Sequence, residues 1–398
     1  MKKSVLVIIS IVLVVIMTAC SLPTFGGSNQ GEPEKIKIGV VCPLTGESSL
    51  YGDVLHQTLT IMAENANAAG GIIGKQVELV IYDNRDDAVE TTNAARRAAL
   101  DDKVIAFIGT DSSTTTLAMI EVATDNEIPV IATIATNSKI TQADDGTTRP
   151  WAFRTCLSDP QNGAILGQYA VKELGHKRIS IIHDIGSDYS IGIMQEFTKN
   201  VELAGGVIVS NEAHNTGDVD FRAVLTKIKN AGDFDALFIA EGYYKQIGLI
   251  ANQARELGIT QAFISTEGTQ SSDILNIAGD AIEGLVFNVP TNTESDNVKP
   301  LIAEFTERWG YDPSINVGGD CYLAYDAFNY LKKAIEIAGS LDTKKIRDAL
   351  ESIEEMEGLT NKIIFDTSRH LVYREVPILQ IINGKYEVVR MYMMEKEA

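Results

Sequence analysis

The sequence has little positive charge, and this shortage narrows the range of partners. Its 398 residues contain 34 Lys and Arg against 54 Asp and Glu, so the formal net charge is -20. No long basic run interrupts the acidic background. Basic residues supply most of the affinity for nucleic acid and for anionic membrane surfaces, so neither is an expected partner.

Histidine and cysteine are also scarce. The five histidines, at positions 56, 176, 183, 214 and 370, show no ligand spacing, so we expect no metal site and no cofactor. Apart from Cys20, which lies in the N-terminal targeting signal, three cysteines remain: Cys42, Cys156 and Cys321. An odd number this small excludes a disulfide scaffold and permits at most one bridge. We expect buried, unpaired side chains.

Enzyme motifs are missing as well. The sequence has no G-x-S-x-G, no H-E-x-x-H and no C-x-x-C. The stretch "GGIIGKQ" leaves a helix for a strand, the reverse of the order that a phosphate-binding loop needs. We therefore predict a protein that is not an enzyme. The enzyme alternative is an extracytoplasmic hydrolase, for which Ser187 after His183 is the nearest nucleophile and base, without elbow geometry.

The N-terminus carries a targeting signal. Lys2 and Lys3 precede the apolar stretch "SVLVIISIVLVVIM", which is shorter than the ~20 residues that a spanning helix needs. The ending "MTAC" resembles a bacterial lipoprotein processing site, which implies removal of residues 1–19 and lipidation of Cys20. An uncleaved membrane anchor is the alternative, and both place the rest outside the cytoplasm. Residues 20–35 are rich in Gly, Pro and polar side chains, which predicts a lipid-anchored tether.

The rest of the chain alternates between short apolar runs and helical patterns, twice over. The first set of expected strands is 36–41, 77–82, 104–109 and 128–133, with helices over 53–71 and 88–100. The second set is 178–184, 206–211, 235–242, 262–266 and 284–289, with helices over 162–175, 221–232 and 244–258. Further helices are expected near 298–308, 320–338 and 343–352, followed by a hairpin that turns at Asn383-Gly384. This order predicts an α/β fold with two Rossmann-like lobes and parallel-rich sheets.

Polar residues gather where these strands end, the edge at which open α/β sheets bind ligands. In "GTDSSTTT" (109–116) a strand gives way to a helix that begins near Thr114, and its free amides suit a carboxylate. Capping by Ser112 or Ser113 with no further role is the alternative. Glu267 follows another strand, and it is either a surface residue or a counter-charge for a ligand cation.

From about residue 36 to the C-terminus, the sequence resembles the leucine/isoleucine/valine-type substrate-binding proteins of ABC importers. The resemblance rests on residues 36–87 and on "IGTDSSTTT", "IPVIATIATNSKI", "HDIGSDYSIG", "EGYYKQIG" and "TEGTQSSDILNIAGDAIEGL", in that order. It implies a type I periplasmic-binding-protein fold with a three-strand hinge. Lobe one would comprise 36–154 plus 287–362, and lobe two 155–286 plus 363–398.

The resemblance also implies a binding site for an amino acid. Ser113 and Thr136 fall on the family's hydroxyl positions, Ile134 on the position whose carbonyl meets the ammonium, and Glu267 on the glutamate. The aromatic positions that line the cleft fall on Tyr51, Tyr189 and Tyr243.

Two departures from the family pattern stand out. The family disulfide of lobe one would need cysteines at Asp86 and Ser112. Asp111 and Asp320 stand where the leucine-type relatives face an aliphatic ligand side chain. They either pair with protein donors such as Arg85 or Arg154, or meet a polar or cationic group of the ligand.

We therefore expect a monomeric, lipid-anchored, extracytoplasmic protein that captures an amino acid and delivers it to an ABC transporter permease. The resemblance to the family implies a branched-chain amino acid, whereas Asp111 and Asp320 favour a polar or basic one. The alternative within the same fold is a binding protein that senses an amide or other small molecule without transport.

Overall fold

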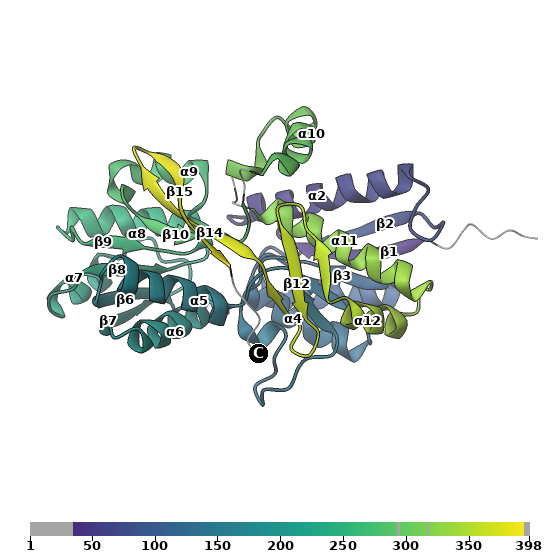
Figure 1. Ribbon diagram of the computed structural model, residues 1–398, viewed down its shortest axis with the longest axis horizontal. Coiled ribbons are helices and arrows are strands. Elements are labelled where there is room, and N and C mark those ends of the chain that lie inside the picture. The colour runs from purple at the N-terminus through teal and green to yellow at the C-terminus, as the bar shows by residue number, and fades with distance from the viewer. Residues whose placement is uncertain (1–34, 293–294, 316, 318, 394–398) are drawn as a thin grey trace, which may run out of the picture. The chain divides into compact units, whose positions relative to one another are not determined.

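The computed structural model describes residues 35–292, 295–315, 317 and 319–393. The expected signal segment, Cys20 and the tether up to residue 34 lie outside the described residues. The described chain has two lobes, each built on a largely parallel sheet flanked by helices (Figure 1). The predicted α/β fold with two lobes is confirmed.

The first lobe contains a sheet of five parallel strands in the order β2-β1-β3-β4-β5. Its strands are β1 (Ile36–Cys42), β2 (Val77–Asp83), β3 (Ala106–Ile108), β4 (Val130–Ala132) and β5 (Ala152–Arg154). Neighbouring strand residues point into different cores: Val40 packs on one face and Val41 on the other. The helices of this lobe are α2 (Ser49–Ala68), α3 (Ala88–Arg97), α4 (Ser113–Asp125), α11 (Asp320–Ala338) and α12 (Thr343–Ser352).

The second lobe contains a sheet of seven strands in the order β15-β14-β10-β9-β8-β6-β7. Five are parallel: β6 (Arg178–Asp184), β7 (Val207–His214), β8 (Ala236–Ala240), β9 (Ala262–Ile264) and β10 (Val286–Asn288). The antiparallel pair is β14 (Glu375–Ile382) and β15 (Lys385–Met393). Asn383 and Gly384 join them with φ of 52° and 67°, so the predicted hairpin turn is confirmed.

The remaining helices follow strands of the second sheet or the links between the lobes. They are α5 (Asp159–Gln168), α6 (Asp188–Leu203), α7 (Arg222–Asn230), α8 (Tyr244–Glu256), α9 (Ser272–Ala278) and α10 (Lys299–Trp309). Helix α5 begins three residues before the predicted range, because Gln161 Oε1 accepts a hydrogen bond from Ser158 N at 2.9 Å and Pro160 lies in the first turn.

The chain passes from one sheet to the other three times: after β5, after β10 and after β13. A small antiparallel sheet precedes the last passage, with strands β11 (Glu355–Glu357), β12 (Lys362–Asp366) and β13 (Leu371–Tyr373). The lobe limits expected at 287 and 363 fall inside β10 and β12, and Phe365 and Val372 pack into a core of the first lobe. Strands of three residues such as β5 and β11 show no periodicity, so the sequence pattern did not predict them.

A buried ion pair lies beside the passage into β14. Arg374 and Asp326 are 1% and 0% exposed, and Arg374 Nη1 donates to Asp326 Oδ2 at 3.0 Å. Leu359 N donates to Asp326 Oδ1 at 2.7 Å, while Arg374 also donates to Asn361 and Thr360. Burial raises the pKa of Asp326, although Arg374 offsets part of the shift. The protein therefore supplies partners to both oxygens of Asp326 and to all three nitrogens of the Arg374 guanidinium.

Candidate functional site

A cavity of about 180 Å³ lies where the carboxyl ends of strands from both sheets meet. Eight of the nine side chains expected at the site line it: Tyr51, Asp111, Ser113, Ile134, Tyr189, Tyr243, Glu267 and Asp320. Thr136 lines a smaller adjoining cavity, which shares Ile134, Glu267 and Asp320 with the first. The structure thus brings eight of the expected residues to one cavity and Thr136 to the cavity that adjoins it.

The N-terminus of helix α4 lies at this cavity. Ser112 is the N-cap, with its Oγ accepting from Thr115 N at 3.3 Å, and the helix begins at Ser113, close to the predicted start. The Thr110 hydroxyl hydrogen-bonds with those of Thr115 and Thr116, at 2.6 and 2.8 Å. These three hydroxyls therefore satisfy one another inside the protein.

The cavity receives only part of the hydroxyl run: Ser112, Ser113 and Thr114 line it. Ser113 is 1% exposed, and its Oγ accepts from Asn137 N at 3.2 Å, which leaves the hydroxyl hydrogen free to donate. The first amides of a helix have no partners within it and carry the positive end of the helix dipole. An anion such as a carboxylate fits this end of the cavity.

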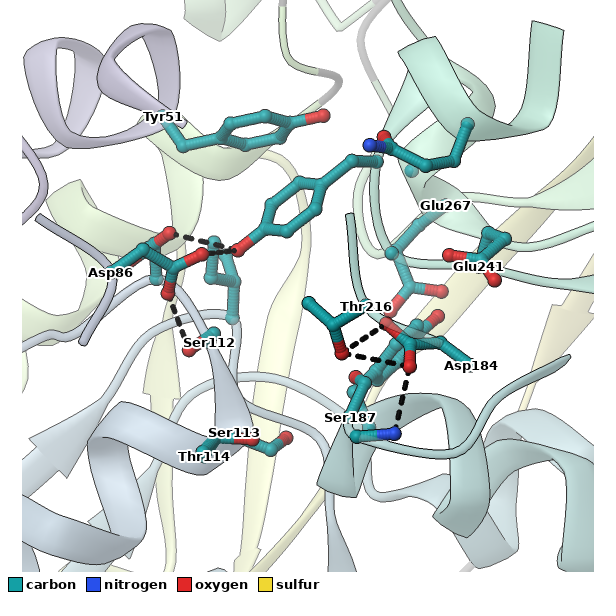
Figure 2. A pocket seen from close by; sticks show the side chains of 18 of the residues that line it. Tyr51, Asp86, Ser112, Ser113, Thr114, Asp184, Ser187, Thr216, Glu241 and Glu267 are labelled. Atoms are coloured by element: carbon teal, nitrogen blue, oxygen red, sulfur yellow. Dashed lines mark hydrogen bonds between the residues drawn. The ribbon is translucent and has the colours of Figure 1, made fainter. Parts of the chain in front are cut away.

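A hydrogen bond joins the two residues at the positions of the family disulfide. Ser112 Oγ donates to Asp86 Oδ1 at 2.9 Å. Ser48 Oγ donates to the other oxygen of Asp86 at 3.1 Å, and the Tyr243 hydroxyl donates to that oxygen at 2.8 Å. Asp86 is therefore held by three donors at the wall of the cavity, and Figure 2 shows the hydrogen bond from Ser112.

Asp111 lies beside Asp86 with few partners. It is 6% exposed, its Oδ1 has no hydrogen-bond partner among the described residues, and its Oδ2 lies 3.3 Å from the Tyr243 hydroxyl. Burial, followed by the charge of Asp86, raises the pKa of Asp111 well above its ordinary value. Sequence reasoning gave no role to Asp86 beyond the missing disulfide, because contact between residues 86 and 111 depends on the fold.

Asp320 opens α11 on the same wall. Burial, followed by the charge of Glu267, raises its pKa well above the ordinary range. Among the described residues, neither Asp320 nor Asp111 forms an ion pair with Arg85 or Arg154. Arg154 instead donates to the carbonyls of Thr136 and Asn137, at 3.0 and 2.7 Å. Pairing with these arginines, one of the two options left open by the sequence, is therefore not what the described chain does.

Glu267 begins a short 3₁₀ turn after β9. Its Oε2 is buried and has no hydrogen-bond partner among the described residues. Burial raises the pKa of Glu267 to about 7, while its own backbone and the Tyr189 hydroxyl oppose the shift. A ligand cation at this position would restore the ionised carboxylate.

The wall formed by the second lobe holds polar residues that sequence reasoning missed. Asp184 ends β6, His214 ends β7, and Thr216 and Glu241 follow the ends of β7 and β8. Figure 2 shows Asp184, Thr216 and Glu241 at the cavity. Thr216 Oγ1 lies 2.8 Å from each carboxylate oxygen of Asp184, and His214 Nε2 lies 2.5 Å from Glu241 Oε1. Their place at strand ends was visible in the sequence, but charged residues in loops usually face solvent.

The hydrolase alternative gains no support from this wall. Ser187 is the N-cap of α6, with its Oγ accepting from Ser190 N at 3.2 Å. His183 lies within β6, and no hydrogen bond joins it to Ser187 in the described chain. Cys42, Cys156 and Cys321 are free and buried.

The described lining of the cavity is rich in acidic residues, and its one histidine, His214, is paired with Glu241. Six carboxyl residues line the cavity, namely Asp86, Asp111, Asp184, Glu241, Glu267 and Asp320, and no lysine or arginine is among the described lining residues. The described residues contain no group of three or more His, Cys, Asp or Glu arranged to hold a metal ion. No described helix is both long enough and apolar enough to cross a membrane.

Hydrogen bonds connect the lobes around the cavity. The Tyr243 hydroxyl reaches Asp86 from the second lobe, and Asn137 Nδ2 donates to the Asp188 carbonyl at 2.6 Å. Asp188 N donates to Thr114 Oγ1 at 3.3 Å. The lobes are thus closed onto each other at the start of α6 and at the loop before α8.

Comparisons with known proteins agree with this geometry. A family model for periplasmic binding proteins matches residues 35–385. A leucine-, isoleucine-, valine-, threonine- and alanine-binding protein of Pseudomonas aeruginosa is 32% identical over 333 residues, covering 84% of this chain and 86% of the relative.

Two solved structures extend the match. The leucine-binding protein LivK of Thermotoga maritima has a TM-score of 0.80 at 30% identity, and the alignment covers 89% of this chain and 98% of LivK. The branched-chain amino acid transporter substrate-binding protein LivJ of Streptococcus pneumoniae, in complex with isoleucine, has a TM-score of 0.80 at 28% identity, with 91% and 100% covered. The chain belongs to the periplasmic binding protein family and has the type I fold of its leucine/isoleucine/valine-binding members.

Proposed function

We propose that this protein captures an α-amino acid between its two lobes, outside the cytoplasm, and delivers it to the permease of an ABC transporter. One observation carries the proposal: the N-terminus of α4 with Ser113 and the carboxyl group of Glu267 line the same cavity. The first suits a carboxylate and the second suits an ammonium group. The amino acids bound by the Pseudomonas relative and the isoleucine in the Streptococcus structure support the amino-acid class.

The α-carboxylate would lie at the start of α4, where the Ser113 hydroxyl and the free amides donate to it. The ammonium group would donate to the Ile134 carbonyl, to Thr136 and to Glu267. Tyr51, Tyr189 and Tyr243 would enclose the ligand between the lobes. Asp111 and Asp320 would face the ligand side chain, which we expect to be polar or basic because carboxyl groups gain nothing from an aliphatic neighbour.

Closure would signal to the permease that the site is filled. The contacts of Tyr243 with Asp86 and of Asp188 with Asn137 and Thr114 can form only when the lobes approach each other. A ligand that touches both lobes favours this closed state and needs no covalent chemistry. Lipidation of Cys20 after removal of residues 1–19 would hold the protein, as a monomer, near the permease.

Thermal unfolding and isothermal titration of the full chain with a panel of L-amino acids test the function. Binding to the native state raises the melting temperature, so at least one α-amino acid should do so. Glu267→Gln keeps the shape but removes the charge that meets the ammonium, and should weaken binding by about 10- to 100-fold. Glu202→Gln, an exposed glutamate near the end of α6, is the matched control.

Failure of every amino acid to bind would refute the proposed function. Unchanged affinity in Glu267→Gln would refute the assigned ammonium site. Uptake of the ligand by cells that make this protein, lost when the protein is deleted, distinguishes transport from sensing alone.

A further inference from the structure

Asp86, Asp111 and Asp320 form an acidic wall of the cavity, and the described protein supplies too few hydrogen-bond donors for all three carboxyl groups. Asp86 accepts hydrogen bonds from Ser48, Ser112 and Tyr243, so its position is fixed. Asp111 has no comparable set of donors. The Tyr243 hydroxyl has one hydrogen, and it lies 2.8 Å from Asp86 Oδ2 but 3.3 Å from Asp111 Oδ2.

Asp111 is therefore a buried acceptor in need of a donor. Its exposed fraction is 6%, and its Oδ1 has no partner among the described residues. A carboxyl group removed from water without hydrogen bonds is costly, and a ligand that supplies the missing donors relieves that cost. Asp320 is half-buried and lines the same cavity, and no donor to its carboxyl group is found among the described residues.

Resting on the function proposed above, we infer that the ligand is a basic α-amino acid, such as L-lysine or L-arginine, whose side-chain cation lies among Asp86, Asp111 and Asp320. In this arrangement Asp86, which no sequence pattern assigned to the ligand, is a specificity-determining residue. The distinction between basic and merely polar side chains comes from the pair of neighbouring aspartates. An amide side chain can donate a hydrogen bond to Asp111, but only a cation also offsets the repulsion between two carboxylates.

An aliphatic side chain would do the opposite. A leucyl group against Asp111 would complete the exclusion of water from Oδ1 and provide no donor in exchange. Sites built around polar groups reject ligands that leave those groups unpaired more strongly than apolar pockets reject a missing methylene. The acidic wall should therefore exclude leucine as well as attract lysine and arginine.

Proton release follows from the same geometry. Burial and the charge of Asp86 raise the pKa of Asp111, and burial and Glu267 raise that of Asp320. Tyr51, Tyr243 and Cys42 also lie near this wall, and each has a raised pKa of its own, so they are neutral at pH 7. Asp53 and Asp83 lie beyond Cys42. A cation that enters the site favours the ionised carboxylates and displaces their protons.

The test is calorimetric titration of the full chain, purified in detergent, with L-arginine, L-lysine, L-glutamine and L-leucine. Titration in two buffers of different ionisation enthalpy measures proton release. L-arginine or L-lysine should bind at least 100-fold more tightly than L-leucine, and should release more protons than L-leucine at pH 7. Asp111→Asn should weaken binding of the basic ligand by about 10- to 100-fold without weakening binding of L-leucine.

Asp86→Asn should reduce the same preference, while Asp233→Asn should leave all affinities unchanged. Asp233 is exposed before β8, at the opposite end of that strand from the cavity. Tighter binding of L-leucine or L-glutamine than of both basic ligands would overturn the inference and leave the proposed function standing. Absence of binding by any amino acid would overturn both. Equal loss of L-leucine and basic-ligand affinity in Asp111→Asn would show a structural role for Asp111 and also overturn the inference.

Discussion

Two aspartates of the first lobe are almost equally buried but have opposite surroundings. Asp326, at the passage between the lobes, is 0% exposed and is paired with Arg374, with a backbone amide on its other oxygen. Asp111, at the cavity, is 6% exposed. Its Oδ2 lies 3.3 Å from the Tyr243 hydroxyl, and its Oδ1 has no partner among the described residues. The first carboxylate is satisfied by the protein itself, whereas the second depends on a molecule from outside. The same residue type thus serves structure in one place and recognition in the other.

Breaking the Asp326–Arg374 pair should produce the largest effect on stability. Asp326→Asn leaves the Arg374 guanidinium buried without its counter-charge, and loss of one partner from such a pair costs about 3–5 kcal/mol. Urea unfolding of the variant should show this decrease in the free energy of unfolding. A decrease below about 1 kcal/mol would mean that water or another group replaces the aspartate, and would weaken the contrast with Asp111.

The same substitution at Asp111 should act in the opposite direction. Asp111→Asn removes the cost of burying, beside Asp86, a carboxyl group that lacks donors, so the ligand-free protein should gain about 0.5–2 kcal/mol of stability. Urea unfolding without ligand measures the gain, and Asp233→Asn should change stability by less than about 0.5 kcal/mol. Destabilisation by Asp111→Asn would show that the carboxyl group has a structural partner after all.

Stability and ligand affinity should depend on pH in opposite directions because of Glu267. Glu267 has its pKa raised from 4.5 to about 7, so in the ligand-free protein its contribution to stability is present below pH 4.5 and is lost as the pH rises to 7. Ligand affinity should change in the other direction, because the ammonium prefers the ionised carboxylate. Glu267 faces Tyr189, Asp159, Cys156 and Asp320, whose pKa values are raised as well.

Titration calorimetry from pH 5.5 to pH 8 checks this expectation. Affinity for an α-amino acid should increase by up to about tenfold per pH unit below pH 7, for each proton released. Glu267→Gln should flatten the profile. Affinity that falls as the pH rises through 7 would contradict the assigned role of Glu267.

Removal of the Tyr243 hydroxyl group, which connects the lobes, should give the smallest effect on ligand binding. Tyr243→Phe deletes the hydroxyl that donates to Asp86 from the second lobe, and should weaken ligand binding by about 0.5–1.5 kcal/mol. Tyr244→Phe is a matched control, because the Tyr244 hydroxyl interacts with Asp273 within its own lobe. Equal effects of the two substitutions would show that the contact between Tyr243 and Asp86 contributes nothing specific to closure.

The hydroxyl run at residues 109–116 illustrates how far the sequence leads. Its position after an apolar strand predicted a helix N-terminus suited to an anion, and the structure places that helix start at the cavity. Local pattern could not show that Thr115 and Thr116 hydrogen-bond to Thr110 while Ser113 and Thr114 line the cavity. That division depends on which side chains face the second lobe.

The acidic residues show the opposite limit. Asp86, Asp184 and Glu241 lie at strand ends, and nothing in their local sequence distinguishes them from solvent-exposed loop acids. They acquire a common environment because parallel strands place their carboxyl ends at one edge of each sheet and because the two edges face each other. Burial and mutual charge then determine which of these carboxyls needs a partner from outside.

The sequence by itself determined the α/β alternation, the two lobes, the hairpin at Asn383-Gly384 and the family, because strand and helix periodicity and turn chemistry are local properties of the chain. Only the tertiary structure decided that Asp326 is neutralised by Arg374, 48 residues away, and that Asp111 is not neutralised by any arginine of the described chain. Electrostatic pairing depends on distance in space and on exclusion of water, and neither quantity is defined until the two lobes have folded and met.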